Sequence, residues 1–375
     1  MSVRGNQLRL ATRGSELARW QASLIEEQLT QRRLSVECVE VETTGDQLRD
    51  ELIHQLGTTG AFVRSLDQQV LDGDVDAAVH SMKDMPTDQP DDLVVAAVPE
   101  RAAAGDVLLT PDGTELEALP AGAMIGTSSL RRGAQLLAER PDLEIEPLRG
   151  NVDTRVEKLL APSLQREHER RLEAEEGEEG AYDAANDHSS AESAFDRSAG
   201  EWFDALSEIE RQALGREVET EYDAICLAEA GLARSGLLRH LEYERLDPTR
   251  IVPAPAQGAI AVTAVDGEVA ERINDIVDHP PTRIETTVER TILAELGGGC
   301  VAPVGIHAKL QGQVLNTAVR VLSQDGTEQV RGTRELPVDT PVRAARDFAA
   351  HLADQGAAEL IEQARRSDPD DAKRA

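Results

Sequence analysis

Short apolar runs alternate with segments of helical periodicity along the first half of the chain. A run at residues 8–12 predicts a strand, and Ser15 is placed to cap the helix that follows. The positions that define this helix are Leu17, Trp20, Leu24 and the polar Gln28. Further strands are predicted at residues 35–41, 75–80, 93–98, 106–110, 123–126, 144–148 and 222–228, and further helices at residues 62–71, 130–140 and 152–160. This alternation predicts two successive α/β units, which we expect to form two lobes around a cleft.

The last third of the chain follows a different pattern. A strand is predicted at residues 258–265 and a helix at 282–296, stopped by three glycines. Strands separated by turns at 311–312 and 325–326 come next, and a helix with apolar residues from Val342 to Leu352 closes the pattern. We therefore expect a small α+β C-terminal domain. The predicted boundaries are residues 1–100 with 256–278 for the first lobe, 101–255 for the second and 279–375 for the last domain.

Two segments fit neither pattern. Residues 44–60 have little periodicity and several turn formers, which predicts a mobile loop. Residues 161–220 hold 17 acidic and 6 basic side chains, too polar a mixture to order fully. The second half of this insertion, with Trp202, Leu206 and Ile209 at helical spacing, predicts one amphipathic helix. We expect a flexible, solvated insertion that loops away from the cleft, with partner binding as the alternative.

The composition limits the partners and the environment of the protein. A net charge of −31 and a pI near 4.6 argue against nucleic acid or an anionic membrane as partner. Only four of the 39 basic residues are lysines and 2% of residues are aromatic, which indicates adaptation to high salt. No apolar leader or 18-residue apolar run occurs, so we expect a cytoplasmic protein. We separately expect it to be a monomer.

Several predicted strands end in side chains that attract anions. Arg13 and Ser15 follow the first strand, and a His-Ser-Met-Lys-Asp run ends at Asp84. Ligands of α/β proteins bind at this edge of the sheet, and helix starts with Ser or Thr attract anions. Five arginines lie at such strand ends or first helical turns: Arg13, Arg131, Arg132, Arg149 and Arg155. Because guanidinium groups bind carboxylates in bidentate fashion, this set predicts a polyanionic substrate.

Two further residues are candidates for chemistry. The three cysteines are far apart, which predicts neither a disulfide framework nor a metal site. Cys226 lies in an apolar strand and Cys38 in an alternating one, and both suit packing. Cys300 follows three glycines and suits a nucleophile, a covalent attachment point or an incidental loop position. Asp84 suits either the stabilisation of a cation or an ordinary cap paired to Lys83.

Taken in order, these motifs resemble the porphobilinogen deaminase family. The matching segments are residues 11–15, 80–84, 126–132, 148–151, 255–258 and 297–300. The resemblance spans residues 8 to about 330 and is interrupted only by the acidic insertion. It implies two lobes like those of periplasmic binding proteins plus a third, cysteine-bearing domain. It also implies tetrapyrrole biosynthesis, in which four porphobilinogens are joined head to tail with loss of ammonia to give hydroxymethylbilane.

The resemblance also implies roles for individual residues. Cys300 would carry a covalent dipyrromethane cofactor, and Asp84 would stabilise the azafulvene cation and move its proton. The residues implied in cofactor binding are Lys83, Thr127, Ser129, Arg131 and Arg132. Those implied in substrate binding are Arg13, Ser15, Arg149 and Arg155, with Arg101 and Arg234 at less distinctive positions. No metal is implied.

The chain departs from the family pattern in two places. The loop before Phe62 lacks the lysines common in relatives, and residues 102–106 lack a common arginine. Two other functions remain open on the residues alone. A two-lobed anion-binding protein would explain the arginines but not Asp84 together with Cys300. An acyl-transfer enzyme using Cys300 would need a base, and only His307 is near it in sequence.

Overall fold

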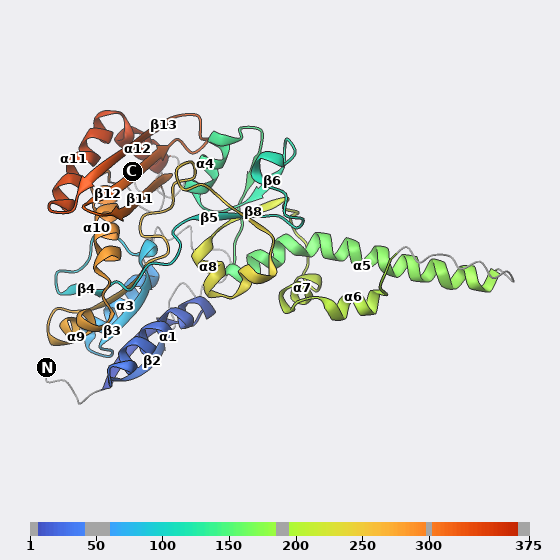
Figure 1. The fold of residues 1–375 in the computed structure, drawn as a ribbon, viewed down its shortest axis with the longest axis horizontal. Helices are drawn as coiled ribbons and strands as arrows, with labels where there is room; N and C mark the ends of the chain where they lie inside the picture. The colour runs from blue at the N-terminus through green and yellow to red at the C-terminus, as the bar shows by residue number, and fades with distance from the viewer. Residues whose placement is uncertain (1–6, 42–60, 185–194, 298–301, 367–375) are drawn as a thin grey trace.

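The computed structural model describes residues 7–41, 61–184, 195–297 and 302–366. Its strands form three separate sheets, two with five strands and one with three. Figure 1 shows each sheet with its helices as a distinct body, and a long helical arm that projects from one of them. The predicted fold class, two α/β lobes and a smaller α+β domain, is confirmed.

Lobe 1 is the body built on the sheet of order β2-β1-β3-β10-β4. Its strands are β1 (Gln7–Arg13), β2 (Ser35–Val41), β3 (Ala77–Ser81), β4 (Leu93–Ala97) and β10 (Ile260–Val265). Its helices are α1 (Glu16–Gln31), α3 (Ala61–Asp72) and α9 (Glu268–Val277), with the 3₁₀ turn η1 (Met82–Asp84). Leu10 packs with the core under α1 and α9, whereas its neighbour Ala11 packs with the core under α3. Alternation along one strand therefore buries both faces of this sheet.

Lobe 2 is the body built on the sheet of order β7-β6-β8-β5-β9. Its strands are β5 (Asp106–Leu109), β6 (Met124–Gly126), β7 (Glu144–Glu146), β8 (Ala224–Ala228) and β9 (Tyr243–Arg245). Its helices are α4 (Leu130–Glu139), α5 (Val152–Ala184) and α8 (Glu229–Arg234), with 3₁₀ turns η2 (Leu116–Ala118) and η3 (Leu237–His240). Leu108 and Cys226 pack towards α4, while Val107 and Ile225 pack towards α5. This sheet too is covered on both faces.

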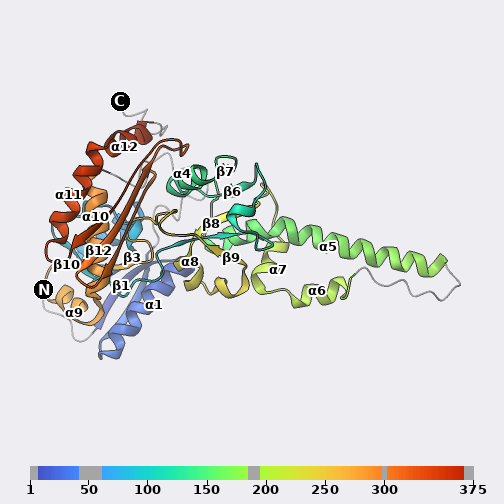
Figure 2. The same ribbon diagram turned by 45° about the horizontal axis from the view of Figure 1, so that its top comes forward.

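The third domain is an antiparallel sheet of order β11-β12-β13 with three helices. Its elements are α10 (Pro280–Glu295), β11 (Val304–Gln311), β12 (Val314–Leu322), β13 (Gln329–Pro337), α11 (Pro341–Asp354) and α12 (Ala357–Arg366). One core joins Ile292 of α10, Val319 of β12 and Phe348 of α11. Figure 2 shows the helices gathered along one side of this sheet. The closing helix of the sequence pattern is α11, and the additional helix α12 follows it.

The face of α1 that packs into lobe 1 differs from the predicted one. Ser15 caps α1 as expected, accepting from the Ala18 N–H at 3.3 Å. The buried residues of the helix are Gln21, Ala22, Ile25 and Leu29. Leu17 and Trp20 do not enter this core, and Trp20 is 40% exposed. The apolar positions of the sequence pattern therefore serve two surfaces, the core and the side facing lobe 2.

The acidic insertion is largely helical within the described residues. Helix α5 continues through its first half as far as Ala184, and the arm in Figure 1 is completed by α6 (Ala199–Ala205) and α7 (Glu208–Leu214). The single helix predicted for the second half is thus two short helices, because Ser207 starts a second capping box. Further out along the arm, the guanidinium carbon of Arg171 lies 4.4 Å from the ring centre of Phe195 and 5.4 Å from that of Trp202.

The base of the arm belongs to the core of lobe 2. Ile209 and Ala213 of α7 are buried in the same cluster as Leu160 and Ile225. Gln165 holds α7 to α5, because its side-chain amide donates to the Leu214 and Arg216 carbonyls at 3.1 and 2.6 Å. The insertion at residues 161–220 is therefore partly built into lobe 2, and does not project from it as a whole.

Two deletions of different length are expected to separate the base of the arm from its outer part. Replacing residues 170–205 by a short Gly-Ser linker should leave turnover intact and destabilise lobe 2 less than a longer deletion, because it spares Ile209 and Ala213. Removing residues 161–220 should destabilise lobe 2, since buried core residues are lost. Thermal unfolding of both proteins in molar KCl measures the difference. Equal stability of the two would contradict a structural role of the base.

None of the helices in the described ranges combines the length and the apolar character needed to cross a bilayer.

Candidate active site in the cleft between the lobes

A cleft lies where lobes 1 and 2 and the segment that joins β9 to β10 meet. Its lining bounds about 540 Å³ of space, which includes open solvent. Lobe 1 contributes α1, β3 and η1, and lobe 2 contributes α4, α5, β8 and α8. The lining residues are Leu17, Gln21, Ser81, Lys83, Arg132, Val152, Arg155, Leu227, Ala228, Ala230, Gly231, Arg234, Gln257, Gly258 and Ala259.

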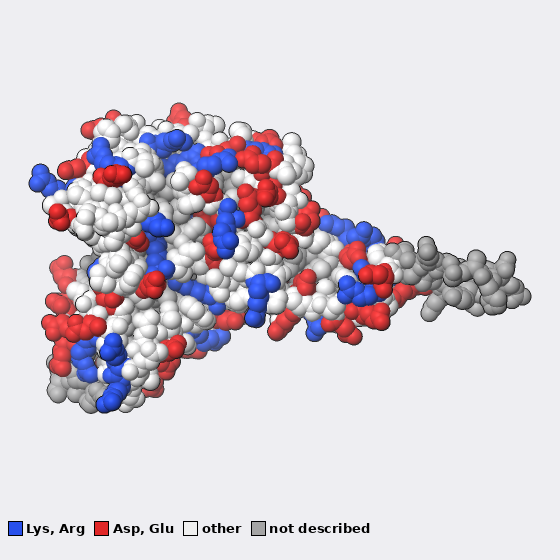
Figure 3. Space-filling model, in the orientation of Figure 1, with Lys and Arg blue, Asp and Glu red and all other residues white. Residues whose placement is uncertain are grey.

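The charge of the cleft is opposite to that of the protein. Among the described residues that line it are four cations, Lys83, Arg132, Arg155 and Arg234, and no aspartate or glutamate. The whole chain has 70 acidic residues against 39 basic ones. On the face drawn in Figure 3, acidic and basic side chains are interspersed, and several basic side chains lie in the central part of the molecule. Such a cleft selects a ligand with several negative charges.

Lys83 and Asp84 are placed by the turn at the end of β3. Met82 is buried with Met85 and Val98, which fixes η1. Burial lowers the pKa of Lys83 from its ordinary 10.5, with Asp84 raising it and Arg132 lowering it further. Within the described residues, Lys83 makes no hydrogen bond or ion pair. Asp84 is exposed and does not line the cleft, although it lies close enough to interact electrostatically with Lys83 and Arg132.

A buried network supports the end of β3 from below. The His80 Nε2 atom lies 2.9 Å from Asp67 Oδ1 and 3.0 Å from Thr263 Oγ1. The Thr263 hydroxyl also donates to Asp67 at 2.8 Å. These contacts join β3 to α3 and β10. Gln21 of α1 hydrogen-bonds Ser81 at 2.9 Å, so the turn that carries Lys83 is held from both faces of the sheet.

Arg131 and Arg132, at the start of α4, share one buried carboxylate. Arg131 Nη1 lies 2.7 Å from Asp106 Oδ2, and Arg132 Nη2 lies 2.8 Å from Asp106 Oδ1. The Gln257 side-chain amide donates to Asp106 Oδ1 at 2.9 Å. Burial alone would raise the pKa of Asp106, but Arg131 and Arg132 outweigh it and hold this pKa well below its usual range. Asp106 thus stays ionised and fixes both guanidinium groups.

The hydroxyl groups expected at the site lie at turns. Ser129 caps α4 by accepting from the Arg132 N–H at 3.4 Å, and Thr127 Oγ1 accepts from the Ser129 N–H at 3.2 Å. Ser15 has the equivalent position at α1, just after Arg13 at the end of β1. These side chains follow the carboxyl ends of β1 and β6, as the sequence predicts.

Three other expected arginines differ in their surroundings. Arg149 is exposed just before α5. Arg155 lines the cleft, and its Nε donates to the Gly150 carbonyl at 2.8 Å. Burial, followed by the charge of Arg132, lowers the pKa of Arg155. Arg234 also lines the cleft, and burial lowers its pKa to about 10.

The structure does not bring Arg101 into the cleft. Its two terminal nitrogens donate to both carboxylate oxygens of Glu289 at 2.8 and 3.0 Å. Glu289 is fully buried and also accepts from the Ala256 and Ala308 N–H groups at 2.6 and 2.8 Å. We therefore no longer expect Arg101 to bind substrate. Instead, it joins the third domain to the segment between the lobes.

Of the three cysteines, two are described. Burial raises the pKa of Cys38 to about 11 and that of Cys226 to about 12, so neither thiol ionises readily. Both fit the packing role expected from the sequence. Cys300 lies outside the described residues, as does the expected mobile loop.

Sequence reasoning missed several residues that organise the site. Asp106, Gln257 and Glu289 are each buried in or between cores, and their partners are far away in sequence. The sequence offers one signal of this network in Asp106, an acidic residue at the start of an otherwise apolar strand. An unpaired carboxylate is costly to bury, so such an acid predicts a buried cationic partner.

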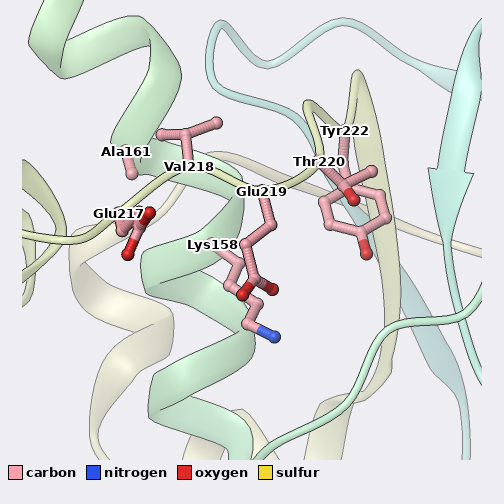
Figure 4. A pocket seen from close by; sticks show the side chains of 7 residues that line it. All are labelled: Lys158, Ala161, Glu217, Val218, Glu219, Thr220 and Tyr222. Atoms are coloured by element: carbon pink, nitrogen blue, oxygen red, sulfur yellow. The ribbon is translucent and has the colours of Figure 1, made fainter.

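A second pocket lies at the base of the arm (Figure 4). It is smaller, about 280 Å³, and is lined by Lys158 and Ala161 of α5, by Tyr222 and by residues 217–220. Its lining has one lysine and two glutamates, Glu217 and Glu219, so the net charge of the pocket is negative. The pocket therefore lacks the excess of cations that distinguishes the cleft.

Known proteins resemble this chain over most of its length. Residues 8–166 and 210–272 match the family model "Porphobilinogen deaminase, dipyromethane cofactor binding domain", and residues 283–354 match "Porphobilinogen deaminase, C-terminal domain". A probable porphobilinogen deaminase of Halobacterium salinarum is 54% identical, covering 96% of this chain and 98% of that one. The porphobilinogen deaminase of Desulforudis audaxviator is 37% identical, covering 95% and 97%. The chain belongs to the porphobilinogen deaminase family.

Proposed function

We propose that the protein joins four porphobilinogen molecules head to tail, with loss of ammonia, to give hydroxymethylbilane in tetrapyrrole biosynthesis. The observation that carries this proposal is the cleft with four cations and no acid among its described lining residues. Each porphobilinogen brings an acetate and a propionate, so the bound chain gains two negative charges at every addition. A protein of net charge −31 needs such a local excess of cations to hold that product.

The residues present fit a dipyrromethane cofactor attached at Cys300. Lys83 has three N–H donors and no partner among the described residues, which suits a cofactor carboxylate. The other residues proposed to hold the cofactor carboxylates are Thr127, Ser129, Arg131 and Arg132. The cofactor supplies a free pyrrole α-carbon on which the chain is extended. Arg131 and Arg132 are fixed by Asp106 before any ligand binds, so they contribute preformed guanidinium groups.

Asp84 is proposed as the catalytic carboxylate. When ammonia leaves porphobilinogen, the carbon–nitrogen bond of the aminomethyl group breaks and positive charge spreads onto the pyrrole nitrogen. A carboxylate beside that nitrogen stabilises the charge, and it can accept the proton lost when the new carbon–carbon bond forms. Asp84 is exposed, and no described residue bonds it, so its oxygens are available for this task.

The carboxylates of substrate are assigned to the remaining cleft and strand-end residues. These are Arg13, Ser15, Arg149, Arg155 and Arg234. Arg155 and Arg234 carry this proposal furthest because both line the cleft from lobe 2, opposite Lys83 of lobe 1. Arg101 is left out, since Glu289 occupies its guanidinium.

The intact mass of the purified protein tests the function. A dipyrromethane adduct that maps to the peptide containing Cys300, and that is lost in Cys300→Ser, is expected. Cys38→Ser and Cys226→Ser serve as controls and should keep the adduct. A bare Cys300 that stays bare after incubation with porphobilinogen would instead favour the two-lobed anion-binding protein.

We also propose that the protein works as a cytoplasmic monomer without nucleic acid or membrane partners. Its charge of −31 supports the last two points, because polyanions and anionic lipids repel such a surface. Sedimentation in molar KCl measures the oligomeric state, and a dimer would refute the proposal that the protein is a monomer.

The lowered pKa of Lys83 predicts how turnover changes with pH. As the pH rises, Lys83 loses its proton before an ordinary lysine with a pKa of 10.5 would, while Arg132, whose pKa Asp106 raises, stays charged. Lys83 should therefore hold its cofactor carboxylate less firmly on the alkaline side, and kcat should fall there. In Lys83→Arg this fall should shrink, whereas Lys158→Arg, outside the cleft, should keep it. An unchanged alkaline fall of kcat in Lys83→Arg would assign it to another group, such as Arg234 with its pKa of about 10.

A further inference from the structure

An exposed tryptophan stands at the edge of the cleft. Trp20 is one of only two tryptophans in a chain with 2% aromatic residues, and it is 40% exposed. It lies on α1, one position from Gln21 and three from Leu17, both of which line the cleft. Ala22, Ile25 and Leu29 supply the core contacts of this helix without it. Packing of lobe 1 therefore does not explain Trp20.

Arg234 faces Trp20 from the other lobe. Its guanidinium carbon lies 5.6 Å from the centre of the indole ring. One terminal nitrogen donates to the Gly258 carbonyl at 2.7 Å, which anchors the side chain. The Nε atom is buried and has no partner among the described residues. A buried donor without a partner is costly, so this nitrogen suits a ligand acceptor.

Together the two side chains offer complementary chemistry. An indole face stacks on flat aromatic rings, and a guanidinium group binds carboxylates. A pyrrole that carries acetate and propionate substituents has both features. We propose that Trp20 and Arg234 form a subsite at the edge of the cleft that binds the ring of an incoming porphobilinogen before its addition. This inference rests on the proposed function, which supplies the pyrrole carboxylate.

The two side chains of the proposed subsite come from different lobes. Trp20 belongs to α1 of lobe 1 and Arg234 to α8 of lobe 2, while the Gly258 carbonyl belongs to the segment that joins the two lobes. A ring held between Trp20 and Arg234 therefore stays at the mouth while Lys83 and Arg132 hold carboxylates further in. Without a ligand, the cation–π contact between the two side chains occupies the same surfaces.

Fluorescence tests the subsite directly, because the only other tryptophan lies in the arm. Trp202→Phe leaves Trp20 as the single tryptophan, and Trp20→Phe leaves Trp202. The probe is the porphobilinogen analogue with a methyl group in place of the aminomethyl group, which cannot lose ammonia. We expect saturable quenching in Trp202→Phe and none in Trp20→Phe. Equal quenching in both, or in neither, would overturn the proposal.

Kinetics provide the second readout. Trp20→Ala should raise KM for porphobilinogen about fivefold to tenfold with kcat within about twofold, the size of a lost aromatic stack. Trp20→Phe should recover part of the affinity, Arg234→Gln should raise KM similarly, and Trp202→Ala should change neither constant. If Trp20 only joins the lobes, Trp20→Ala will lower kcat and leave KM unchanged. Wild-type protein without adduct or turnover would instead refute the proposed function, whatever the titration shows.

Discussion

Asp84→Asn is expected to reduce kcat by at least about 100-fold while the protein keeps its fold and its dipyrromethane. The substitution removes the charge but preserves the size of the side chain. Asp84 is exposed and has no bond to a described residue, so the fold does not depend on it. Turnover of porphobilinogen and intact mass, measured on the same preparation, separate the loss of chemistry from the loss of cofactor.

A neighbouring carboxylate provides the control. Asp88 is also exposed, four positions further along, and lies outside the cleft lining. Asp88→Asn should therefore retain wild-type turnover. Asp84→Asn with turnover within threefold of wild type would remove Asp84 from the mechanism.

Asp106→Ala should produce the largest loss of stability, about 3–5 kcal/mol, the usual effect of breaking a buried ion pair from one side. The change leaves Arg131 and Arg132 buried without their shared carboxylate, and Gln257 loses an acceptor. Chemical unfolding in molar KCl measures the loss. Glu157→Gln breaks a pair with Arg216, whose side chain is 29% exposed, at the base of the arm and should cost less than Asp106→Ala.

The pH dependence of the Asp106 effect follows from its pKa. This pKa is depressed in the folded protein, so ionised Asp106 stabilises the fold at every pH above its ordinary value of 3.8. The stabilisation is lost only as the pH falls below 3.8 towards the folded value. The stability difference between wild type and Asp106→Ala should thus be constant from pH 8 to pH 5 and shrink in stronger acid. A difference that already shrinks between pH 7 and pH 5 would contradict the assignment.

The elements of both lobes, and the turns that carry the candidate site residues, were predictable because their signals are local. Ser15 and Ser129 cap helices through contacts three residues away, and Lys83 follows directly from the end of β3. The buried contacts that hold these turns were not predictable. Asp106 meets Gln257 from 151 positions away, and Arg101 meets Glu289 from 188 positions away. No periodicity in a single sequence pairs residues over such distances.

The face of α1 shows a second limit of pattern analysis. Leu17 and Trp20 are as apolar as the core residues Ile25 and Leu29, so spacing alone cannot tell a cleft from a core. The acidic arm shows a third limit. Its composition predicts incomplete order, yet α7 buries Ile209 and Ala213 against lobe 2. A few apolar residues at the right spacing decide the packing of that helix despite the acidic average.

The interrupted course of lobe 1 has a consequence for the synthesis of the protein. Strand β10 lies between β3 and the edge strand β4, but it follows lobe 2 in the chain. Ribosomes add about 5–20 residues per second, so residues 98–259 delay β10 by about 8–30 s after β4 has emerged. Lobe 2 is continuous over this stretch and can fold meanwhile. Until β10 is synthesised, the edges of β3 and β4 that pair with it stay unpaired. Lobe 1 is therefore the part of the nascent chain that most needs a chaperone.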